Sequence, residues 1–383
     1  MTAHASSRDH GPAPLSAAAA PEAPPARQRH ALLRIGPFEF DLPVVQAALS
    51  GYSDAPMRRV ARRCGAPYAL HEVVLDKLVL QPGKLQKKIL DLAADDHPIG
   101  GQLMGADPGQ FAAAASRMAA SGFDVVDLNF GCPVKKVLGR CRGGFLLSDP
   151  PTAIEIVRRV REQVPQRTPV TVKMRRGMDD SLESERAFFA IFDAAFELGV
   201  AAITVHGRTV QQRYSGPSRW EFLRRVKRHA GERVILGSGD LFSASDAVRM
   251  IEQTGVDGVT LARGCIGNPW IFREARALLD GQPLPEPPDV AEQGRVIRAH
   301  FDLAVAAEGA RQAARTMRKF GIKYSELHPL AAEVRAAFIR ARDADEWLAV
   351  LDRWYDAARD WPPGVRREGP GHLVAAGATL CDV

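Results

Sequence analysis

The stretch that decides the fold reads VVDLNFGCP and covers residues 125–133. Residues 125–129 form a short apolar run, which predicts a buried β-strand. The strand stops at a rigid corner, because Gly131 can adopt backbone angles closed to other residues, while Pro133 fixes its own φ and restricts Cys132. The Cys132 thiol is therefore held in one direction at a strand end. An ordinary buried turn would use the same corner, so the rest of the chain has to decide between a reactive site and a turn.

The pattern around this stretch repeats along the chain. From about residue 40, short apolar runs alternate with longer amphipathic stretches, which is typical of β/α units around a parallel sheet. Strands are predicted over residues 44–49, 68–72, 99–104, 125–129, 170–173, 202–206, 234–237 and 258–261. Helices are predicted over residues 55–63, 108–120, 153–163, 183–198, 220–229 and 243–253, whereas the charged segment 74–94 lacks a clean helical pattern. Eight parallel strands favour a (β/α)₈ TIM barrel over an open doubly wound sheet, which needs fewer strands.

The remaining segments differ in composition. Residues 1–29 are rich in Ala, Pro, Ser and Gly without a hydrophobic period, which predicts a disordered leader. The barrel is expected over residues 30–281, followed by a Pro-rich linker over 282–289. After that only helical patterns appear, so we expect an all-helical domain over 290–361 and a loose tail over 362–383.

Composition and charge narrow the functional class. The chain has 383 residues, of which 46% are hydrophobic, enough for a sizeable core. Its net charge of +6 suits a polyanionic partner, although a modest positive charge is commonly only solvated surface. Five cysteines without a CxxC pair argue against a zinc or dithiol site and fit a reducing compartment. The apolar run at 15–20 is too short for a signal or membrane segment. We therefore expect a cytoplasmic monomer without metal or membrane partner.

Functional side chains of such barrels gather at the C-terminal ends of the strands. Read in order, the predicted strand ends give Gln102, Asn129, Cys132, Lys173, Arg175, His206, Arg208, residues 237–240, Arg263 and Gly264. Each has a structural explanation on its own, such as a Lys173 ion pair with a loop carboxylate. The last two groups are more specific, because they place backbone N–H groups and a cation after strands seven and eight, where such barrels bind phosphate. A cofactor with one phosphate would then put its ring near Gln102, Lys173 and His206.

These motifs resemble, in the same order, those of the tRNA-dihydrouridine synthases. The matching stretches are DLNFGCP at 127–133, GGFLL at 143–147, VKMR at 172–175, VHGRT at 205–209 with Tyr214 and Gly216, GD at 239–240, ARG at 262–264, GNPW at 267–270 and MRK at 317–319. The resemblance covers about residues 42–330. It implies an FMN-binding (β/α)₈ barrel with a helical C-terminal domain and tRNA as partner. It also implies NADPH as reductant, although no motif marks a nicotinamide site.

Position by position, the resemblance implies that Cys132 is the catalytic acid. It implies FMN contacts at Ala48, Leu49, Ser50, Gln102, Lys173, His206, Ser238, Gly239, Asp240, Ala262 and Arg263. Two stretches depart from the family pattern: Ala-Ala-Leu at 47–49 replaces the usual Ala-Pro-Met, and Ser-Gly at 238–239 replaces the usual Asn-Gly. Backbone contacts are compatible with both changes, but the shorter Ser238 puts a side-chain contact to the cofactor in question.

The implied reaction is reduction of the C5=C6 bond of a uridine in tRNA, with hydride from flavin to C6 and a proton to C5. A thiol of pKa about 8.5 is protonated at neutral pH and can give that proton. Cys141 is the rival donor, but Arg140 and Arg142 beside it would favour the thiolate. Lys173 would stabilise the anionic reduced ring. From their strand-end positions, Asn129 is expected at the uracil edge and Arg175 at the substrate or a phosphate.

The uridine must leave its stack to enter a barrel, while basic surface holds the rest of the tRNA. Five cations of the helical part share one side of a predicted helix: Arg311, Arg315, Arg318, Lys319 and Lys323. Of these, Arg315 and Lys319 are the expected tRNA-binding residues.

Two alternatives stay open at this stage. One is an FMN barrel of the dihydroorotate dehydrogenase type acting on a free pyrimidine, which the cationic helical appendage disfavours because a small substrate does not need it. The other is a tRNA-binding protein without activity, which Cys132, Lys173 and Arg263 disfavour.

Overall fold

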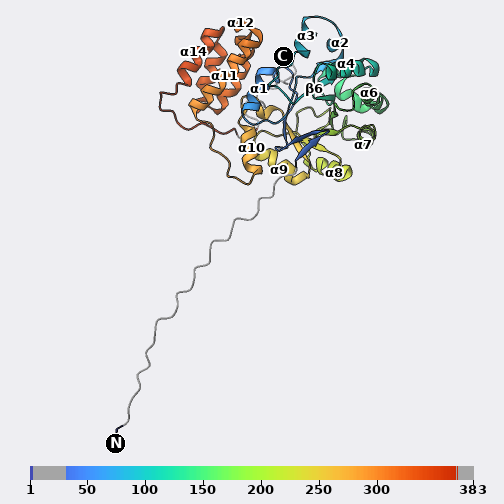
Figure 1. Ribbon diagram of the computed structural model, residues 1–383, viewed down its shortest axis with the longest axis horizontal. Coiled ribbons are helices and arrows are strands. Elements are labelled where there is room, and N and C mark those ends of the chain that lie inside the picture. The colour runs from blue at the N-terminus through green and yellow to red at the C-terminus, as the bar shows by residue number, and fades with distance from the viewer. Residues whose placement is uncertain (3–31, 368, 370–383) are drawn as a thin grey trace.

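The computed structural model of the chain describes residues 1–2, 32–367 and 369. The predicted disordered leader over 1–29 lies outside the described residues except at Met1 and Thr2. A parallel barrel ringed by helices forms one part of the molecule, and further helices lie beside it (Figure 1).

Eight parallel strands form the barrel: β3 (Val44–Gln46), β4 (Ala69–Leu70), β6 (Ile99–Met104), β7 (Val125–Phe130), β8 (Val170–Arg175), β9 (Ala202–His206), β10 (Ile235–Ser238) and β11 (Gly258–Leu261). The ring closes at Ala69, which pairs with Gln46 on one side and Ile99 on the other. The predicted (β/α)₈ barrel is therefore confirmed. The second strand is shorter than predicted, and a separate strand, β5 (Val74–Leu75), pairs with the end of β6.

Six helices follow strands with small shifts at their ends relative to the prediction: α1 (Ala55–Arg63), α4 (Pro108–Ala120), α6 (Pro150–Gln163), α7 (Leu182–Glu197), α8 (Trp220–Ala230) and α9 (Ala244–Thr254). Side-chain N-caps fix where most of them start, as Asp54 does for α1 and Asp107 for α4. The segment 74–94, where no clean helix was predicted, holds two short helices, α2 (Asp76–Leu80) and α3 (Lys84–Leu90). Pro82 and Gly83 separate the two, which explains why no continuous helical pattern appears.

The end of the barrel at which the strands begin, its N-terminal end, is filled by a hairpin that the sequence pattern did not predict. It consists of β1 (Leu33–Ile35) and β2 (Phe38–Phe40), joined by a turn in which Gly36 has φ +58°. Its buried side chains pack with residues at the beginnings of the barrel strands, namely Val45, Tyr68, Val125, Ala202 and Leu236. The hydrophobic filling at this end leaves the C-terminal ends of the strands as the place for a site.

A helical region follows the barrel. After α10 (Ile271–Leu279), residues 282–289 form neither helix nor strand, and α11 (Val290–Glu308), α12 (Ala310–Tyr324), α13 (Ala331–Arg340) and α14 (Ala344–Trp354) come next. Helix α11 packs against α1 of the barrel, and the two helices lie next to each other in Figure 1. Tyr324 of α12 meets Trp270 of the barrel edge-on, with ring centroids 6.3 Å apart. The helical region is thus joined to the barrel through buried side chains.

Two residues of the predicted loose tail, Arg366 and Arg367, are bound to the rest of the protein. Arg367 is buried, forms an ion pair with Glu326 at 2.8 Å and donates to the carbonyl oxygen of Ile266 at 3.0 Å. Arg366 forms an ion pair with Glu274 at 2.7 Å. These partners are distant in sequence, so no local pattern could reveal them. Residues 370–383 of that tail lie outside the described part.

In the described part of the chain, no helix combines the length and the apolar character needed to cross a bilayer.

Candidate active site

A cavity of about 1040 Å³, including its open mouth, lies at the C-terminal ends of the barrel strands. Every position predicted to contact a cofactor lines it, and so do Cys132, Asn129 and Arg175. The other two predicted substrate-binding residues, Arg315 and Lys319, belong to α12 and are not part of its lining. Several lining residues were missed by the sequence analysis, among them Val73, Leu241, Phe242 and Thr260. Val73, Leu241 and Phe242 follow strand ends, and Thr260 lies within β11, but apolar or small side chains give little chemical signal in a sequence.

A chain of hydrogen bonds runs along the cavity wall to Cys132. The Asp127 carboxylate accepts from Gln102 Nε2 at 2.7 Å, and Gln102 Oε1 in turn accepts from Asn129 Nδ2 at 2.7 Å. Asn129 Oδ1 then accepts from the backbone N–H groups of Gly131 and Cys132, each at 3.0 Å. Because the backbone N–H groups of Gly131 and Cys132 can only donate, they fix the direction of every bond in the chain. Both ends of the Asn129 amide are engaged here, which gives this residue a role in holding the corner.

The Cys132 corner is also held from the opposite side. The carbonyl oxygen of Cys132 accepts from the N–H of Gly144 at 3.0 Å. Gly143 has φ +57°, and a Cβ there would lie 2.9 Å from Cys132 Cβ, so only glycine allows this approach. The rival cysteine, Cys141, is exposed and is not part of the cavity lining. The structure thus brings Cys132, and not Cys141, to the cavity.

Lys173 supplies a positive charge to the cavity wall. Burial, with the nearby charge of Arg175, lowers the pKa of Lys173 to about 8, and Asp127 opposes this shift. No acceptor among the described residues forms a hydrogen bond with its Nζ. A partly desolvated ammonium without an acceptor suits an anionic or carbonyl edge of a bound ligand.

His206 presents a neutral ring to the same cavity. Burial and the cations Arg175 and Lys173 hold the pKa of His206 well below its usual range. Its Nδ1 accepts from the backbone N–H of Arg208 at 3.1 Å, which leaves the ring hydrogen on Nε2. His206 can therefore donate a hydrogen bond without carrying a charge.

The ends of β10 and β11 form a cationic corner. Asp240, with φ +58°, accepts from Arg208 Nη2 at 2.8 Å and lies 3.8 Å from Arg263 Nη2. The guanidinium carbon of Arg263 lies over the rings of Tyr214 and Phe242, 5.0 and 4.9 Å from their centroids. Two arginines thus face one carboxylate, an excess of positive charge that suits a phosphate.

Arg175 donates hydrogen bonds to backbone carbonyls of the protein, which its strand-end position did not indicate. Its Nε donates to the Gly131 carbonyl at 2.9 Å, and its Nη1 donates to the carbonyls of Thr209 and Arg213 at 2.9 and 2.7 Å. Burial lowers the pKa of Arg175 to about 10. The residue therefore ties the corner after β7 to the loop after β9, while part of it still lines the cavity.

The five cations of α12 do not share one environment. Arg311, Arg315 and Arg318 are exposed. Lys323 is buried and lies 3.5 Å from Glu326, so its predicted place on an exposed cationic face is wrong, because the end of α12 is packed into the protein. Lys319 is half-buried and donates to the carbonyl of Gly51, in the loop that follows β3.

Comparison with known proteins adds family evidence to this geometry. The model of the family described as dihydrouridine synthase (Dus) matches residues 45–359. A probable tRNA-dihydrouridine synthase of Mycobacterium tuberculosis is 36% identical over 330 residues, which cover 84% of each chain. The tRNA-dihydrouridine synthase B of Pseudomonas aeruginosa is 32% identical over 335 residues, which cover 87% of this chain and 99% of that one.

Similar solved structures share the barrel. Histamine dehydrogenase from Rhizobium sp. 4-9 gives a TM-score of 0.53 at 16% identity, covering 72% of this chain and 51% of that chain. A 2-naphthoyl-CoA reductase gives a TM-score of 0.51 at 12% identity, covering 66% and 52%. At these identities the likeness concerns the fold alone.

Proposed function

The chain belongs to the dihydrouridine synthase family, and on this premise we propose that it reduces the C5=C6 bond of a uridine in tRNA. The proposal includes FMN bound in the barrel cavity, NADPH as reductant and Cys132 as proton donor. The observation that carries it is that Cys132, Lys173, His206 and Arg263, which lie in the C-terminal halves of four different barrel strands or shortly after them, line a single cavity.

The residues of the cavity fit FMN. Apolar side chains such as Leu49 and Leu241 can contact a flat ring, and the Lys173 ammonium has no acceptor from the described residues. Thr260 Oγ1 is buried in the lining and has no hydrogen-bond partner in the described part of the chain. At the other end, Arg263 and the backbone at Gly239 offer a cation and an N–H group to a phosphate. When bound, FMN would supply the hydride that adds to C6 of the uracil.

Cys132 then has to deliver a proton to C5. Addition of hydride to C6 leaves negative charge at C5 and the O4 carbonyl, and transfer of the thiol proton to C5 completes the saturated bond. Asn129 and Gly144 hold the backbone of Cys132 from two sides, so the place from which the thiol projects is set before the substrate arrives. This arrangement favours a donor that acts through its position.

Two other side chains would prepare the cavity for the charge that develops. Lys173 would offset negative charge on the reduced ring or the uracil, which is the electrostatic role that proteins supply to cofactors. His206 would donate from Nε2 as a neutral group, so it adds a hydrogen bond without adding another cation beside Arg175 and Lys173.

The tRNA would be held on basic surface next to the cavity. Arg311, Arg315 and Arg318 are exposed on α12. Three exposed lysines of α3, namely Lys84, Lys87 and Lys88, extend this surface, and Lys88 lies 3.8 Å from Glu308 just before α12. Figure 1 also places α3 and α12 on the same side of the molecule. Cations spread over two elements suit the phosphates of a large nucleic acid.

One experiment tests the proposed function. Protein, NADPH and unmodified tRNA are incubated, and dihydrouridine is mapped by position, with free uridine and orotate as comparison substrates. We expect purified protein with a flavin spectrum and product at defined uridines of tRNA. Turnover of orotate without turnover of tRNA would contradict the proposal, and so would protein that takes up no FMN.

A further inference from the structure

Gly51, in the loop after β3, is held by charged side chains on both sides. Its N–H donates to Glu72 Oε1, and its carbonyl oxygen accepts from Lys319 Nζ. Glu72 lies between β4 and β5 of the barrel, whereas Lys319 comes from α12, 268 positions away in the chain. One peptide unit of the barrel is thus bound between a carboxylate and an ammonium. We refer to Glu72, Gly51 and Lys319 as the clamp.

Aromatic contacts reinforce the clamp from the side of the helical region. Lys319 Nζ lies 4.9 Å from the centroid of the Tyr52 ring, next to Gly51. The Tyr52 ring meets that of Phe320 edge-on, with centroids 5.4 Å apart and an interplanar angle of 86°. Neighbouring residues of α12 therefore contact neighbouring residues of the loop.

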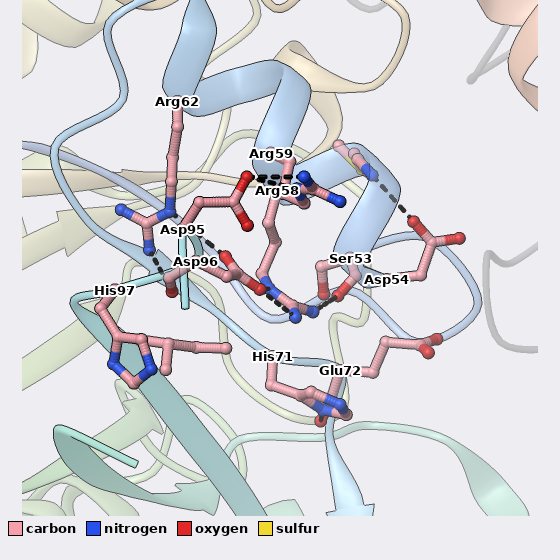
Figure 2. Close-up of polar contacts among 12 residues, drawn as sticks. Ser53, Asp54, Arg58, Arg59, Arg62, His71, Glu72, Asp95, Asp96 and His97 are labelled. Atoms are coloured by element: carbon pink, nitrogen blue, oxygen red, sulfur yellow. Dashed lines mark hydrogen bonds and ion pairs between the residues drawn. The ribbon is translucent and has the colours of Figure 1, made fainter. Parts of the chain in front are cut away.

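The loop is continuous with the cavity wall. Leu49 N–H donates to Ser53 Oγ at 2.8 Å, and the Leu49 carbonyl accepts from Tyr52 N–H at 2.9 Å. The Ser53 carbonyl accepts from Arg58 Nη1 at 2.6 Å, and Arg58 is itself bound to buried Asp96, as Figure 2 shows. Ala48, Leu49 and Ser50, directly before the clamp, line the cavity. A shift of Gly51 would therefore be transmitted to the wall.

We propose that Lys319 and Glu72 are positioning residues that hold residues 48–50 in the shape that binds FMN, so that α12 acts on the cofactor cavity. The identity of the ligand rests on the proposed function. Both hydrogen bonds of the clamp have an ionised partner, which makes them stronger than bonds between neutral groups. Gly51 has φ +73°. Because glycine can adopt many backbone conformations, the contacts of Gly51 are needed to hold it in this one. The clamp also gives Lys319 a role other than the predicted contact with tRNA.

The test measures FMN binding to apoprotein without any turnover. Lys319→Met removes the ammonium but keeps much of the alkyl chain, and Lys319→Arg restores a cationic donor. Arg340→Met, which removes an exposed cation of the same helical region, is the control. We expect Lys319→Met to raise the FMN dissociation constant by about ten-fold, the effect of losing one charge-assisted hydrogen bond. Lys319→Arg should recover most of the affinity, and Arg340→Met should stay within about two-fold of wild type.

A second variant approaches the clamp from the barrel. Glu72→Gln keeps the length of the side chain but loses the ionised acceptor for Gly51 N–H, so FMN binding should weaken in the same direction. Equal FMN affinity in wild type, Lys319→Met and Glu72→Gln would overturn the clamp and leave the proposed function standing. Wild-type protein that binds FMN but forms no dihydrouridine would instead contradict the proposed function, and the clamp would stand on its FMN titrations.

Discussion

The side-chain oxygen of Asn129 and the backbone nitrogen of Cys132 lie 3.0 Å apart, and their hydrogen bond is the last link of a chain that begins at buried Asp127. The position of the thiol therefore depends on a carboxylate two positions before Asn129 and on Gln102 from the neighbouring strand. The hydrogen bonds therefore tie the corner that carries Cys132 to strands β6 and β7 of the barrel.

Replacement of the thiol should separate binding from chemistry. Cys132→Ala removes the proton donor but leaves the backbone contacts of Asn129 and Gly144 in place. We expect FMN and tRNA affinities close to wild type and a loss of turnover of at least about 100-fold, the usual range for a lost general acid. Single-turnover dihydrouridine formation measures this. Cys141→Ala is the matched control, and normal product formation by Cys132→Ala would refute the assignment.

The pKa of Lys173, about 8, predicts how FMN binding responds to pH. The protonated ammonium attracts the cofactor and the neutral amine does not, so the FMN dissociation constant should rise as the pH increases through about 8. Lys173→Met should bind FMN more weakly and lack this step. The FMN phosphate titrates equally with both proteins, so the difference between their FMN titrations at a series of pH values isolates Lys173. A step of the same size in both would contradict the prediction.

Charge reversal on α12 tests the tRNA surface. Arg315→Glu should weaken tRNA binding and lower the slope of log affinity against log salt by about one, because one phosphate contact is lost. Arg117→Glu, on the exposed face of α4, is the control. Lys319→Met should leave the slope unchanged if Lys319 belongs to the clamp. An unchanged slope for Arg315→Glu would remove this residue from the tRNA surface.

Two arginines one position apart on α1 should differ in their effect on stability. Arg58 and Asp96 form a buried ion pair, whereas Arg59 and Asp95 form one at the surface, at 2.6 Å (Figure 2). Arg58→Met leaves Asp96 buried with Arg62 alone, which should lower the free energy of unfolding by about 3 kcal/mol. Arg59→Met should cost less than about 1 kcal/mol. Denaturant unfolding measures both, and equal losses would show that the burial of Asp96 has no energetic effect.

The sequence predicted much of the site because its positions follow a simple rule. Parallel strands end at one face, so Gln102, Lys173, His206 and Arg263 could be placed together from strand patterns alone. The strand patterns did not show which strand-end residues face a ligand and which are hydrogen-bonded within the protein. Arg175 illustrates this, since its acceptors at Thr209 and Arg213 are backbone carbonyls that no side-chain pattern reveals.

Contacts between distant segments account for most of the remaining differences. Lys319 fits a helical cationic stripe by spacing, and only the packing of α12 against the barrel shows that it binds Gly51. Lys323 is buried beside Glu326 for the same reason. The hairpin at residues 33–40 was missed because its strands are only three residues long, too short for an alternating pattern to stand out.

That hairpin also has a kinetic consequence. It fills the N-terminal end of the barrel with packed side chains, which leaves the mouth of the cavity at the C-terminal end as the way in for ligands. A reductant and a flipped uridine that react at the same ring would then use one entrance, and each would have to leave before the other enters. If the proposed reductant and tRNA share this entrance, they would bind in alternation. Double-reciprocal plots at different reductant concentrations should then be parallel lines, and an excess of either substrate should inhibit by blocking the entrance for the other.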